Sequence, residues 1–530
     1  METATRYLAE LCMKKGILLD KESFSLLSSF DSGDLAEIIE KIIGFREKFI
    51  TKSFILNNFD KLQGLISDEK VIEKIKISFG ITLEISKEEI LGKKEEKQIQ
   101  KDSRFEHLKI LYSHANKSKK IEPADFTKYF RVRFMEMRSI LQSRKELDGL
   151  TSINKINGQR QALSIIGIVY GKRVTKNKNI MLEVEDLTGR INVLINKDKE
   201  SVYGKAKSIL VDDIIAIKGT GDQKILFVSD LFYPDCMINE KTFLDRDVCV
   251  AFTSDVHIGS NNFLENNFLK FIRWLNGEVG SEEQREEARK VKYLLITGDT
   301  VDGVGIFPGQ EELLNIKDIR LQYEKLAGFL GMIRKDVTIV LCPGQHDCVR
   351  VAEPQPPVGK DYAECLHNLE NVILVSNPAM IEITGNSGRG FKILMYHGAS
   401  MSSFVNEIEH LRVAKAHGCP TKVVKEILKR RHLAPCHSFV TYIPYDDHDP
   451  LLIKEVPDLI ATADFHKPDV DIYNNILIVC SSCWQSITPF EEKVGNEPDP
   501  CKVPILNLKT RRLKILDFSD DTSGVRNENC

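Results

Sequence analysis

The sequence predicts a multidomain α+β protein, and three observations support this class. The chain has 530 residues, which at roughly 150 residues per domain favours three or four folding units. A helical apolar period near the N-terminus gives way to five short strand-like runs, and then to strand-like runs that end in polar clusters. Hydrophobic residues at 42% and charged residues at 28% exclude a wholly disordered, collagen-like or coiled-coil chain.

Residues 1–80 are predicted to form a small helical domain. Apolar side chains recur there at helical spacing, and the cluster from Asp31 to Asp34 marks a break that can also cap a helix. Residues 81–122 are rich in charge and poor in large apolar side chains, which predicts a solvated, flexible linker. A basic tether for DNA is the alternative for this segment. The helical spacing is carried by Leu35, Ile38, Ile39, Ile42 and Ile43.

Residues 123–240 are predicted to form a helix followed by a small barrel. The helix opens at Pro123 and extends to about Leu147. Five short strand-like runs follow between about Thr151 and Pro234, separated by turn residues such as Thr188-Gly189. Five short antiparallel strands are typical of an OB-fold barrel, a fold that commonly binds single strands on one face and with its loops.

The first connection of this barrel is basic, so it is a candidate DNA contact. The side chains are Lys172, Arg173, Lys176 and Lys178. The alternative is that they only solvate a hairpin, and no strong aromatic platform for stacking bases is evident in the barrel. Overall charge does not decide between the two, because 74 basic against 77 acidic residues give a net charge of -3.

Cysteine usage and hydropathy indicate a cytoplasmic protein without a membrane segment. No apolar run approaches the roughly 18 to 20 residues that cross a bilayer, and the start lacks the order of a signal peptide. The 12 cysteines are scattered, which predicts reduced thiols. Cys480 and Cys483 form a single CxxC; without a second pair, a structural role at a strand end is favoured over a zinc site.

In residues 241–530, five apolar runs end in side chains of the kinds that bind metals. Loops at one edge of a sheet build sites in this way. One strand-terminal Asp or His is usually structural, but five such clusters in one chain favour a metal centre. Gly298 lets the backbone turn sharply and presents Asp299, whose carboxylate can bridge two metals. The clusters hold Asp255 with His257, Asp299, Gln345 with His346 and Asp347, His397, and Asp464 with His466.

The order of these clusters resembles the calcineurin-like metallophosphoesterases, which use two metals such as Mn²⁺ to activate water for attack on phosphorus. The resemblance implies a β-sandwich flanked by helices. It implies a complete ligand set for the first metal, and for the second metal a set with two departures. Those sets are Asp255, His257, Asp299 and His466 for the first metal, and Asp299, Gln345, His397 and Asp464 for the second.

The two departures bear on whether the second site works. Gln345 stands where the family has Asn, so its longer side chain must fold back to ligate. Asp464 stands where the family has His and exchanges an imidazole for a shorter, charged oxygen ligand. His346 matches the family's protonated His that stabilises the transition state or the leaving oxygen, oriented by Asp347.

The segments between the clusters resemble the small-subunit family of the archaeal D-family DNA polymerases. This resemblance implies a replicative heterodimer in which a large catalytic subunit polymerises on primer-template DNA. The small subunit then supplies a 3′ to 5′ exonuclease that uses one or two Mn²⁺ ions, or Mg²⁺, on single-stranded 3′ ends. The segments are GIFPGQ (305–310), HDCVRVAEPQPP (346–357), LKRRHLAP (428–435), EVPDLI (455–460), WQS (484–486) and VPILNLKT (503–510).

Three interpretations of the function follow. The first is the exonuclease. The second is a structural accessory subunit with a degenerate phosphoesterase domain, favoured by Gln345 and Asp464. The third, a free-standing phosphatase or cyclic-nucleotide esterase, is disfavoured by the barrel and by the polymerase-type segments. Arg430 and Arg431, with Lys429, form a basic run that could follow a DNA backbone or could solvate a helix face.

Overall fold

A computed structural model of the chain describes residues 105–115 and 120–519, together with Cys12, Ile17–Leu19, Phe24 and Phe49–Ile50. Contacts divide the chain into two compact units, residues 1–98 and 99–530. In the first unit, β1 (Leu18–Leu19) pairs in parallel with β2 (Phe49–Ile50). The predicted helical domain otherwise lies outside the described residues. No helix in the described part of the chain is long and apolar enough to cross a membrane.

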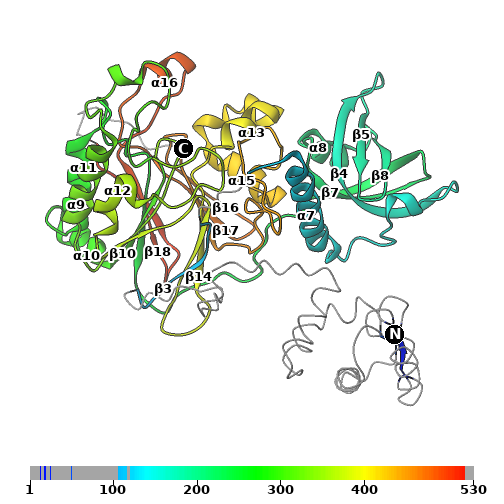
Figure 1. Cartoon of the computed structure of the whole chain (residues 1–530), viewed down its shortest axis with the longest axis horizontal. Helices are drawn as coiled ribbons and strands as arrows, with labels where there is room; N and C mark the ends of the chain where they lie inside the picture. The colour runs from blue at the N-terminus through cyan, green and yellow to red at the C-terminus, as the bar shows by residue number, and fades with distance from the viewer. Residues whose placement is uncertain are drawn as a thin grey trace, which may run out of the picture. The chain divides into compact units, whose positions relative to one another are not determined.

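A closed five-stranded barrel forms where the sequence predicts one (Figure 1). Its strand order is β4-β5-β6-β8-β7, and all neighbours are antiparallel except β6 and β8, which are parallel. Alternate residues of each strand point into one apolar core, as the period of two requires. The elements are β4 (Gln161–Val174), β5 (Ile180–Glu185), β6 (Arg190–Ile195), α8 (Glu200–Lys207), β7 (Ile214–Gly221) and β8 (Ile225–Phe232).

Two six-stranded sheets build the larger part of the second unit. One has the order β12-β11-β10-β9-β18-β19 and the other β16-β17-β15-β14-β13-β3. The strands of the first sheet are β9 (Cys249–Thr253), β10 (Val291–Thr297), β11 (Thr338–Cys342), β12 (Val372–Leu374), β18 (Lys502–Asn507) and β19 (Leu513–Asp517). Those of the second are β3 (Leu108–Ser113), β13 (Ala379–Ile383), β14 (Phe391–Met395), β15 (Leu459–Thr462), β16 (Asp469–Tyr473) and β17 (Ile476–Cys480).

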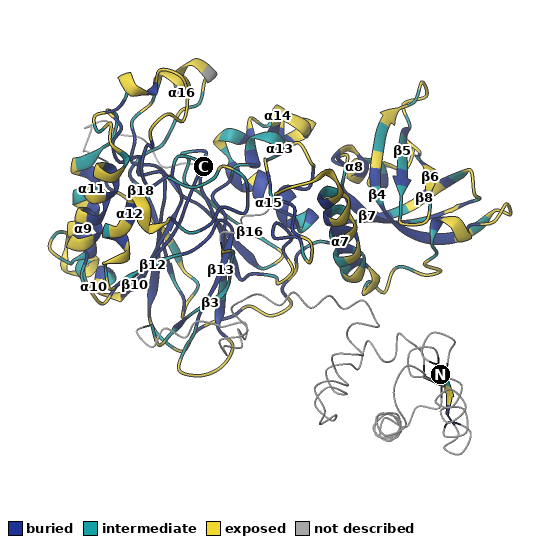
Figure 2. Cartoon of the chain, in the orientation of Figure 1, coloured by how far each residue is buried: buried dark blue, intermediate teal, exposed yellow. Residues whose placement is uncertain are grey.

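The two sheets enclose one apolar core and carry helices on their outer faces. In β9, Val250 and Phe252 pack between the sheets, whereas Ala251 faces the helices α9 and α11. Figure 2 shows the strands buried and the helices exposed on their outer sides. The helices are α9 (Glu265–Leu275), α10 (Glu282–Lys290), α11 (Ile319–Met332), α12 (Lys360–His367), α13 (Met401–Glu407), α14 (Glu409–Val413), α15 (Pro420–Arg430) and α16 (Pro489–Val494).

Strand β3 lies inside the segment for which the sequence predicts a flexible linker. It pairs antiparallel with β13, with Leu108 opposite Ile383 and Ser113 opposite Ala379. The linker prediction is therefore wrong for residues 108–113, and residues 81–104 lie outside the described part. An edge strand needs apolar side chains only on its buried face. Because charged residues surround this strand in the sequence, the composition of the whole segment does not indicate it.

The barrel and the sandwich are joined by helix α7 (Pro123–Gln142) and by a buried ionic cluster. The helix begins at the predicted Pro123 but ends before the predicted Leu147. Arg430 of α15 pairs with Asp213 at the start of β7 at 2.9 Å and with Glu426 of its own helix. On the facing side, Arg133 of α7 pairs with Asp449 at 2.6 Å. These charged groups hold barrel, helix and sandwich together.

Candidate metal centre

The candidate site lies where the strands of both sheets end. Asp255, Asp299, His397 and Asp464 each stand two residues beyond the end of β9, β10, β14 and β15. In the first sheet β9, β10 and β11 are parallel, and in the second β14, β15 and β17 are parallel. Their carboxyl ends therefore meet at one edge of the sandwich, as the sequence predicts.

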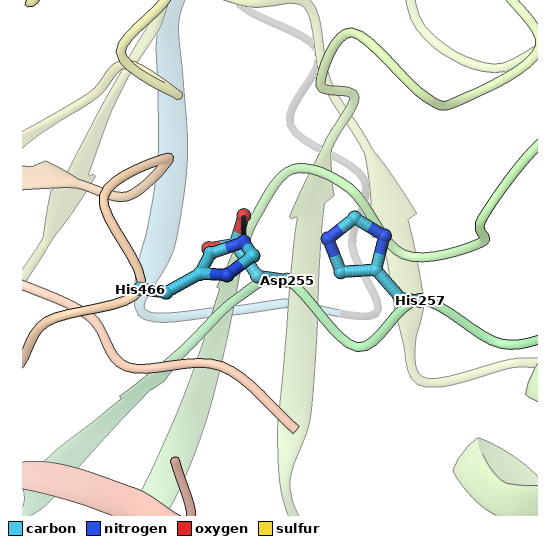
Figure 3. A group of neighbouring side chains, drawn as sticks. All are labelled: Asp255, His257 and His466. Carbon is cyan, nitrogen blue, oxygen red and sulfur yellow. Dashed lines mark ion pairs between the residues drawn. The ribbon is translucent and has the colours of Figure 1, made fainter. Parts of the chain in front are cut away.

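Three side chains form the first ligand group (Figure 3). One ligand atom from each of Asp255, His257 and His466 lies within 4.8 Å of the others. His466 Nε2 is 3.4 Å from Asp255 Oδ1. These are three of the four residues predicted for the first metal. The fourth, Asp299, instead groups with Asp255 and His397, so the structure places Asp255 in both groups.

The second ligand group consists of Asp255, Asp299 and His397, and Asp464 lies beside it. His397 Nε2 is 3.2 Å from Asp299 Oδ2 and 3.8 Å from Asp464 Oδ1. Gln345 is half-buried in the loop after β11, and its side chain hydrogen-bonds to none of the residues that the structure describes. Asp464, which stands where the resemblance expects His, thus lies beside His397. Gln345, which stands where it expects Asn, has no hydrogen-bond partner within the described part of the chain.

Four imidazoles at the site are all held through the same ring nitrogen. Nδ1 of His257 bonds Asp302 Oδ1 at 3.1 Å, and Nδ1 of His466 bonds Glu491 Oε1 at 2.8 Å. Nδ1 of His397 and of His346 bond the carbonyl oxygens of Thr297 and Asp302. Because these oxygens only accept, each Nδ1 carries the proton. Nε2 is then the free ligand atom, an arrangement typical of metal-binding histidines.

The residues fit a divalent cation, because several buried polar atoms at the centre lack hydrogen bonds. Asp255 Oδ1, His257 Nε2 and His397 Nε2 are buried, and each has no hydrogen-bond partner among the residues that the structure describes. A buried polar atom left unpaired costs free energy, which a bound cation removes. Mixed carboxylate and imidazole ligands suit Mn²⁺ better than Mg²⁺, which prefers oxygen ligands alone.

The pKa values of the cluster are shifted by burial and by mutual attraction. Burial disfavours charge on Asp299, yet His397 and His346 hold the pKa of this carboxyl well below its usual range. Burial likewise opposes a charged His397, but Asp299 raises the His397 pKa well above normal. Burial raises the pKa of Asp464 to about 6, and the nearby Asp255 adds to that rise. Anionic and cationic groups of this centre therefore stabilise one another without a metal.

The backbone around the site adopts conformations that are otherwise rare. Asp255, His257, Asp299, Asp464 and His466 all have positive φ, between 47° and 71°. Non-glycine residues in this region cost free energy and cluster at functional sites. Two glycines make room: a Cβ on Gly298 would stand 2.3 Å from His397 Nδ1, and one on Gly344 would stand 2.2 Å from Asp299 Oδ1.

The role predicted for Asp347 is wrong in its detail. The Asp347 carboxylate accepts hydrogen bonds from Thr300, Gly344 and Tyr323, and so fixes the loops after β10 and β11. The His346 ring is oriented by the carbonyl of Asp302 instead. A His and the Asp next to it in sequence point in different directions from the loop, which adjacency in the sequence does not show.

Two carboxylates that position ligands were missed in the sequence. Asp302 holds His257, and Glu491 holds His466. Asp302 is the second acid of the string GDTVDG, three residues after Asp299, and that repeat was the available signal. Glu491 lies in α16, where its other oxygen caps the helix by accepting from Thr488. Its spacing predicts only a cap, so its contact with His466 had no sequence signal.

The predicted DNA contacts of the barrel divide into two kinds. Arg173, Lys176 and Lys178 are exposed, so they stay predictions. Lys172 is half-buried, and its Nζ donates to the carbonyls of Lys207 and Ile209 at 2.7 and 2.8 Å. That ammonium ties β4 to the end of α8 and is not free for a phosphate.

The prediction that Arg430 follows a DNA backbone is wrong. Its side chain is 2% exposed and lies in the ion pairs with Asp213 and Glu426. Arg431 is half-buried and donates to the carbonyls of Ile453 and Lys454. Both guanidinium groups are therefore bound within the protein, and some of their acceptors, such as Asp213, come from segments distant in sequence.

Known proteins resemble this chain over most of its length. The model of the family that holds the B subunits of DNA polymerases alpha and epsilon matches residues 250–470. The DNA polymerase II small subunit of Methanothermobacter thermautotrophicus is 38% identical over 402 residues, which cover 75% of this chain and 80% of that protein. The small subunit of Pyrococcus furiosus is 38% identical over 400 residues, 74% of this chain and 64% of the relative.

A relative from another archaeon gives the same result. The DNA polymerase II small subunit of Halobacterium salinarum is 35% identical over 401 residues, which cover 75% of each chain. Each of these matches spans about 400 residues, and the relatives have the name of the family that the sequence resembles. The chain therefore belongs to the family of archaeal DNA polymerase II small subunits, the small subunits of the D-family polymerases.

Proposed function

We propose that this chain is the small subunit of a two-subunit DNA polymerase and that its metal centre removes nucleotides from single-stranded 3′ ends. The observation that carries the nuclease is the set of buried ligand atoms without hydrogen bonds in the described structure, on Asp255, His257 and His397. Family membership supports the first half of the proposal, together with a large catalytic subunit as the partner. The five-stranded barrel has the strand order of an OB-fold.

The residues of the centre would divide the work between ligation and proton transfer. Asp255, Asp299 and the Nε2 atoms of His257, His397 and His466 would hold one or two divalent cations, with Mn²⁺ favoured. When bound at such a set, these cations lower the pKa of a coordinated water and stabilise charge on phosphoryl oxygens.

His346 would act on the phosphate rather than on the metal. Its Nδ1 proton is held by the Asp302 carbonyl, so only Nε2 is left to face a substrate. Burial disfavours its charged form, but Asp299 raises the His346 pKa overall. A protonated His346 would donate from Nε2 to a phosphate oxygen or to the leaving 3′ oxygen. Asp299 also fixes the loop by accepting from the His346 backbone N–H at 2.8 Å.

The second candidate is a subunit whose centre has lost activity. Gln345, without a hydrogen bond inside the described protein, and Asp464, 3.8 Å from His397, stand where the family resemblance expects Asn and His. In that case the chain assembles the polymerase and positions DNA through its barrel. Retention of the three-residue group Asp255, His257 and His466 and of the carboxylates that hold its imidazoles favours the nuclease.

The test is degradation of a 3′-labelled single strand by the purified chain in Mn²⁺, alone and with the large subunit from the same organism. Cleavage that Asp299→Ala abolishes, in a variant whose circular dichroism spectrum matches that of the unchanged chain, would support the proposal. No cleavage by either preparation, and cleavage restored by Gln345→Asn with Asp464→His, would establish the degenerate subunit instead.

A further inference from the structure

Five exposed apolar side chains stand on two loops next to the candidate metal centre, and we call them the apolar rim. Phe490 is 69% exposed and Phe307 is 40% exposed. Large apolar side chains gathered at the edge of a charged site mark a binding surface more often than isolated ones do. The rim consists of Val304, Ile306 and Phe307 on the loop after β10, and of Ile487 and Phe490 at the start of α16.

The first loop of the rim is tied to a ligand by Gln310. This side chain is fully buried; its Nε2 donates to the Asp302 carbonyl at 2.8 Å and its Oε1 accepts from the Ile306 N–H at 2.9 Å. Asp302 in turn holds the ring of His257. The buried side chains of Asp302 and Gln310 thus connect His257 to the backbone of Ile306, the residue before Phe307.

The second loop is tied to the other side of the centre. Glu491, the residue after Phe490, bonds His466 Nδ1 through one carboxylate oxygen and Thr488 through the other. Phe490 therefore stands on a helical turn that is fixed at His466. Phe490 has 69% of its area open to solvent although its neighbour is 6% exposed.

The two loops are held to one another by a short segment between them. Asn261 Nδ2 donates to the carbonyl of Glu312 at 3.2 Å, and Asn262 Nδ2 donates to that of Ile487 at 3.0 Å. Gln485 Nε2 also donates to the hydroxyl of Ser260, the residue before Asn261, at 2.6 Å. The neighbouring residues Asn261 and Asn262 therefore tie both loops to the segment that follows His257.

We propose that Phe307 and Phe490 stack on the bases of the 3′-terminal nucleotides and so select an unpaired strand end. This inference rests on the proposed nuclease and names how its substrate is held. With the scissile phosphate at the metal centre, the adjoining bases must pass the surface next to His257 and His466. Bases of every kind present a π-face, so stacking on aromatic rings binds single strands without sequence preference. Inside a duplex, the neighbouring base pairs cover these faces.

The test changes one ring at a time and also removes the bases. Phe307→Leu and Phe490→Leu keep the apolar area but lose the aromatic face, and Phe490→Trp restores one. Initial rates of the full chain in Mn²⁺ are compared on a normal oligonucleotide and on one with three abasic residues at its 3′ end. We expect each Leu variant to raise KM about 5- to 20-fold on normal ends. The same variants should leave KM and kcat unchanged on abasic ends.

A matched control is Phe243→Leu. Phe243 is also exposed but precedes β9, at the end of the strand opposite to Asp255. It should behave as the unchanged chain on both substrates. Thermal unfolding of all variants should agree, because the rim side chains are largely in solvent. Phe490→Trp should match the unchanged chain within about twofold if the π-face carries the effect.

Three results would overturn the inference. Leu variants with unchanged KM on normal ends would show that the rings do not touch the bases. An equal rise on abasic ends would show that they act on the centre itself. Loss of assembly with the large subunit, with unchanged degradation by the free chain, would make the rim a protein interface.

Failure of the proposed nuclease is distinguished by a binding measurement. A strand with 2-aminopurine at its 3′ end is titrated with the full chain in Ca²⁺, and quenching of its fluorescence reports stacking without cleavage. The titration gives an affinity for the strand. An affinity at least about fivefold lower for the Phe490→Leu variant supports base contact even where no cleavage occurs. No quenching by the unchanged chain rejects it.

Discussion

Two buried clusters of charged side chains in this protein contain similar groups but differ in how completely those groups are paired. At the junction of barrel and sandwich, Arg430 meets Asp213 at 2.9 Å and Arg133 meets Asp449 at 2.6 Å. At the strand ends, carboxylates lie 3.2 to 3.8 Å from the Nε2 atoms of His397 and His466, and several candidate ligand atoms have no hydrogen bond to the described residues. The junction neutralises its acids with arginines, which stay charged, whereas the acids of the candidate centre face imidazoles, which can give up a proton when a cation binds.

The difference separates structural from functional burial of charge. A buried ion pair whose hydrogen bonds are complete can hold two elements in register, although it contributes little net free energy. A buried group of acids and free imidazole nitrogens is stable only when a cation or a proton enters it. Positive φ values occur at five candidate ligand positions of the centre, whereas at the junction they occur only beside the paired residues, at Asp212 and Arg431. The five positions of the centre are Asp255, His257, Asp299, Asp464 and His466.

The largest effect is expected from breaking the junction. Arg430→Met leaves Asp213 and Glu426 buried without their cation, so we expect the free energy of unfolding to fall by about 3 to 5 kcal/mol. Urea titration measures it. Adding Asp213→Asn should recover part of the loss, because the amide oxygen still accepts from the Leu210 N–H. A decrease of less than about 1 kcal/mol in the free energy of unfolding would show that the charges do not stabilise this junction.

The next effect concerns the carboxylate that holds His466. Glu491→Gln keeps the size of the side chain but loses the charge that orients the imidazole, so the affinity for Mn²⁺ should fall about 10- to 100-fold. Calorimetric titration of the full chain with Mn²⁺ measures the affinity. The exposed neighbour Glu492 supplies the control, Glu492→Gln. Equal affinities of both variants would mean that His466 does not ligate.

A smaller effect is expected from pH at the junction. Burial, reinforced by Arg133, lowers the pKa of His432 from 6.5 in the folded state, while Asp449 accepts from its Nε2 at 2.8 Å. The unfolded chain therefore takes up this proton first as the pH falls. The contribution of His432 is intact above about pH 6.5 and declines below it by up to about 1.4 kcal/mol per pH unit.

This pH dependence can be isolated by a variant. His432→Gln removes the titrating ring but can still donate to Asp449, so the difference in unfolding free energy between the two chains should change between about pH 7 and about pH 5. Urea unfolding at each pH gives this difference, and His367→Gln, at an exposed position, controls for a general effect of losing a histidine. A constant difference across the range would contradict the assignment.

The smallest effect compares the basic side chains of the barrel. Replacing the exposed Arg173, Lys176 and Lys178 by Ala should weaken single-strand binding a few-fold at about 0.1 M salt. It should also lower the salt slope by about 2, because each phosphate contact contributes about 0.7. Lys172→Ala should leave the slope unchanged, since its ammonium is bonded to two carbonyls. Fluorescence anisotropy with a labelled strand measures both. Equal salt slopes for the two variants would contradict the distinction between the exposed basic side chains and Lys172.

Sequence reasoning succeeded where the signal is local. The barrel strands are predictable because their apolar residues alternate between turn residues, and four of the ligand positions because Asp or His follows a strand after a fixed two-residue step. It failed where one side chain depends on a distant partner. The basic run around Arg430 predicts a surface cation, yet Asp213 meets this side chain from 217 positions away.

The amino-acid sequence was sufficient for the family, for the strand-end loops and for most of the side chains that gather at the candidate centre. These follow from period, turn chemistry and residue type, which each short segment carries within itself. Tertiary structure decided which groups are buried and which are paired. It recruited residues 108–113 into a sheet and turned Asp347 away from the His346 ring. It also placed Phe307 and Phe490 beside one centre through Asp302 and Glu491. Such choices rest on contacts between distant segments, whose free energy no local pattern records.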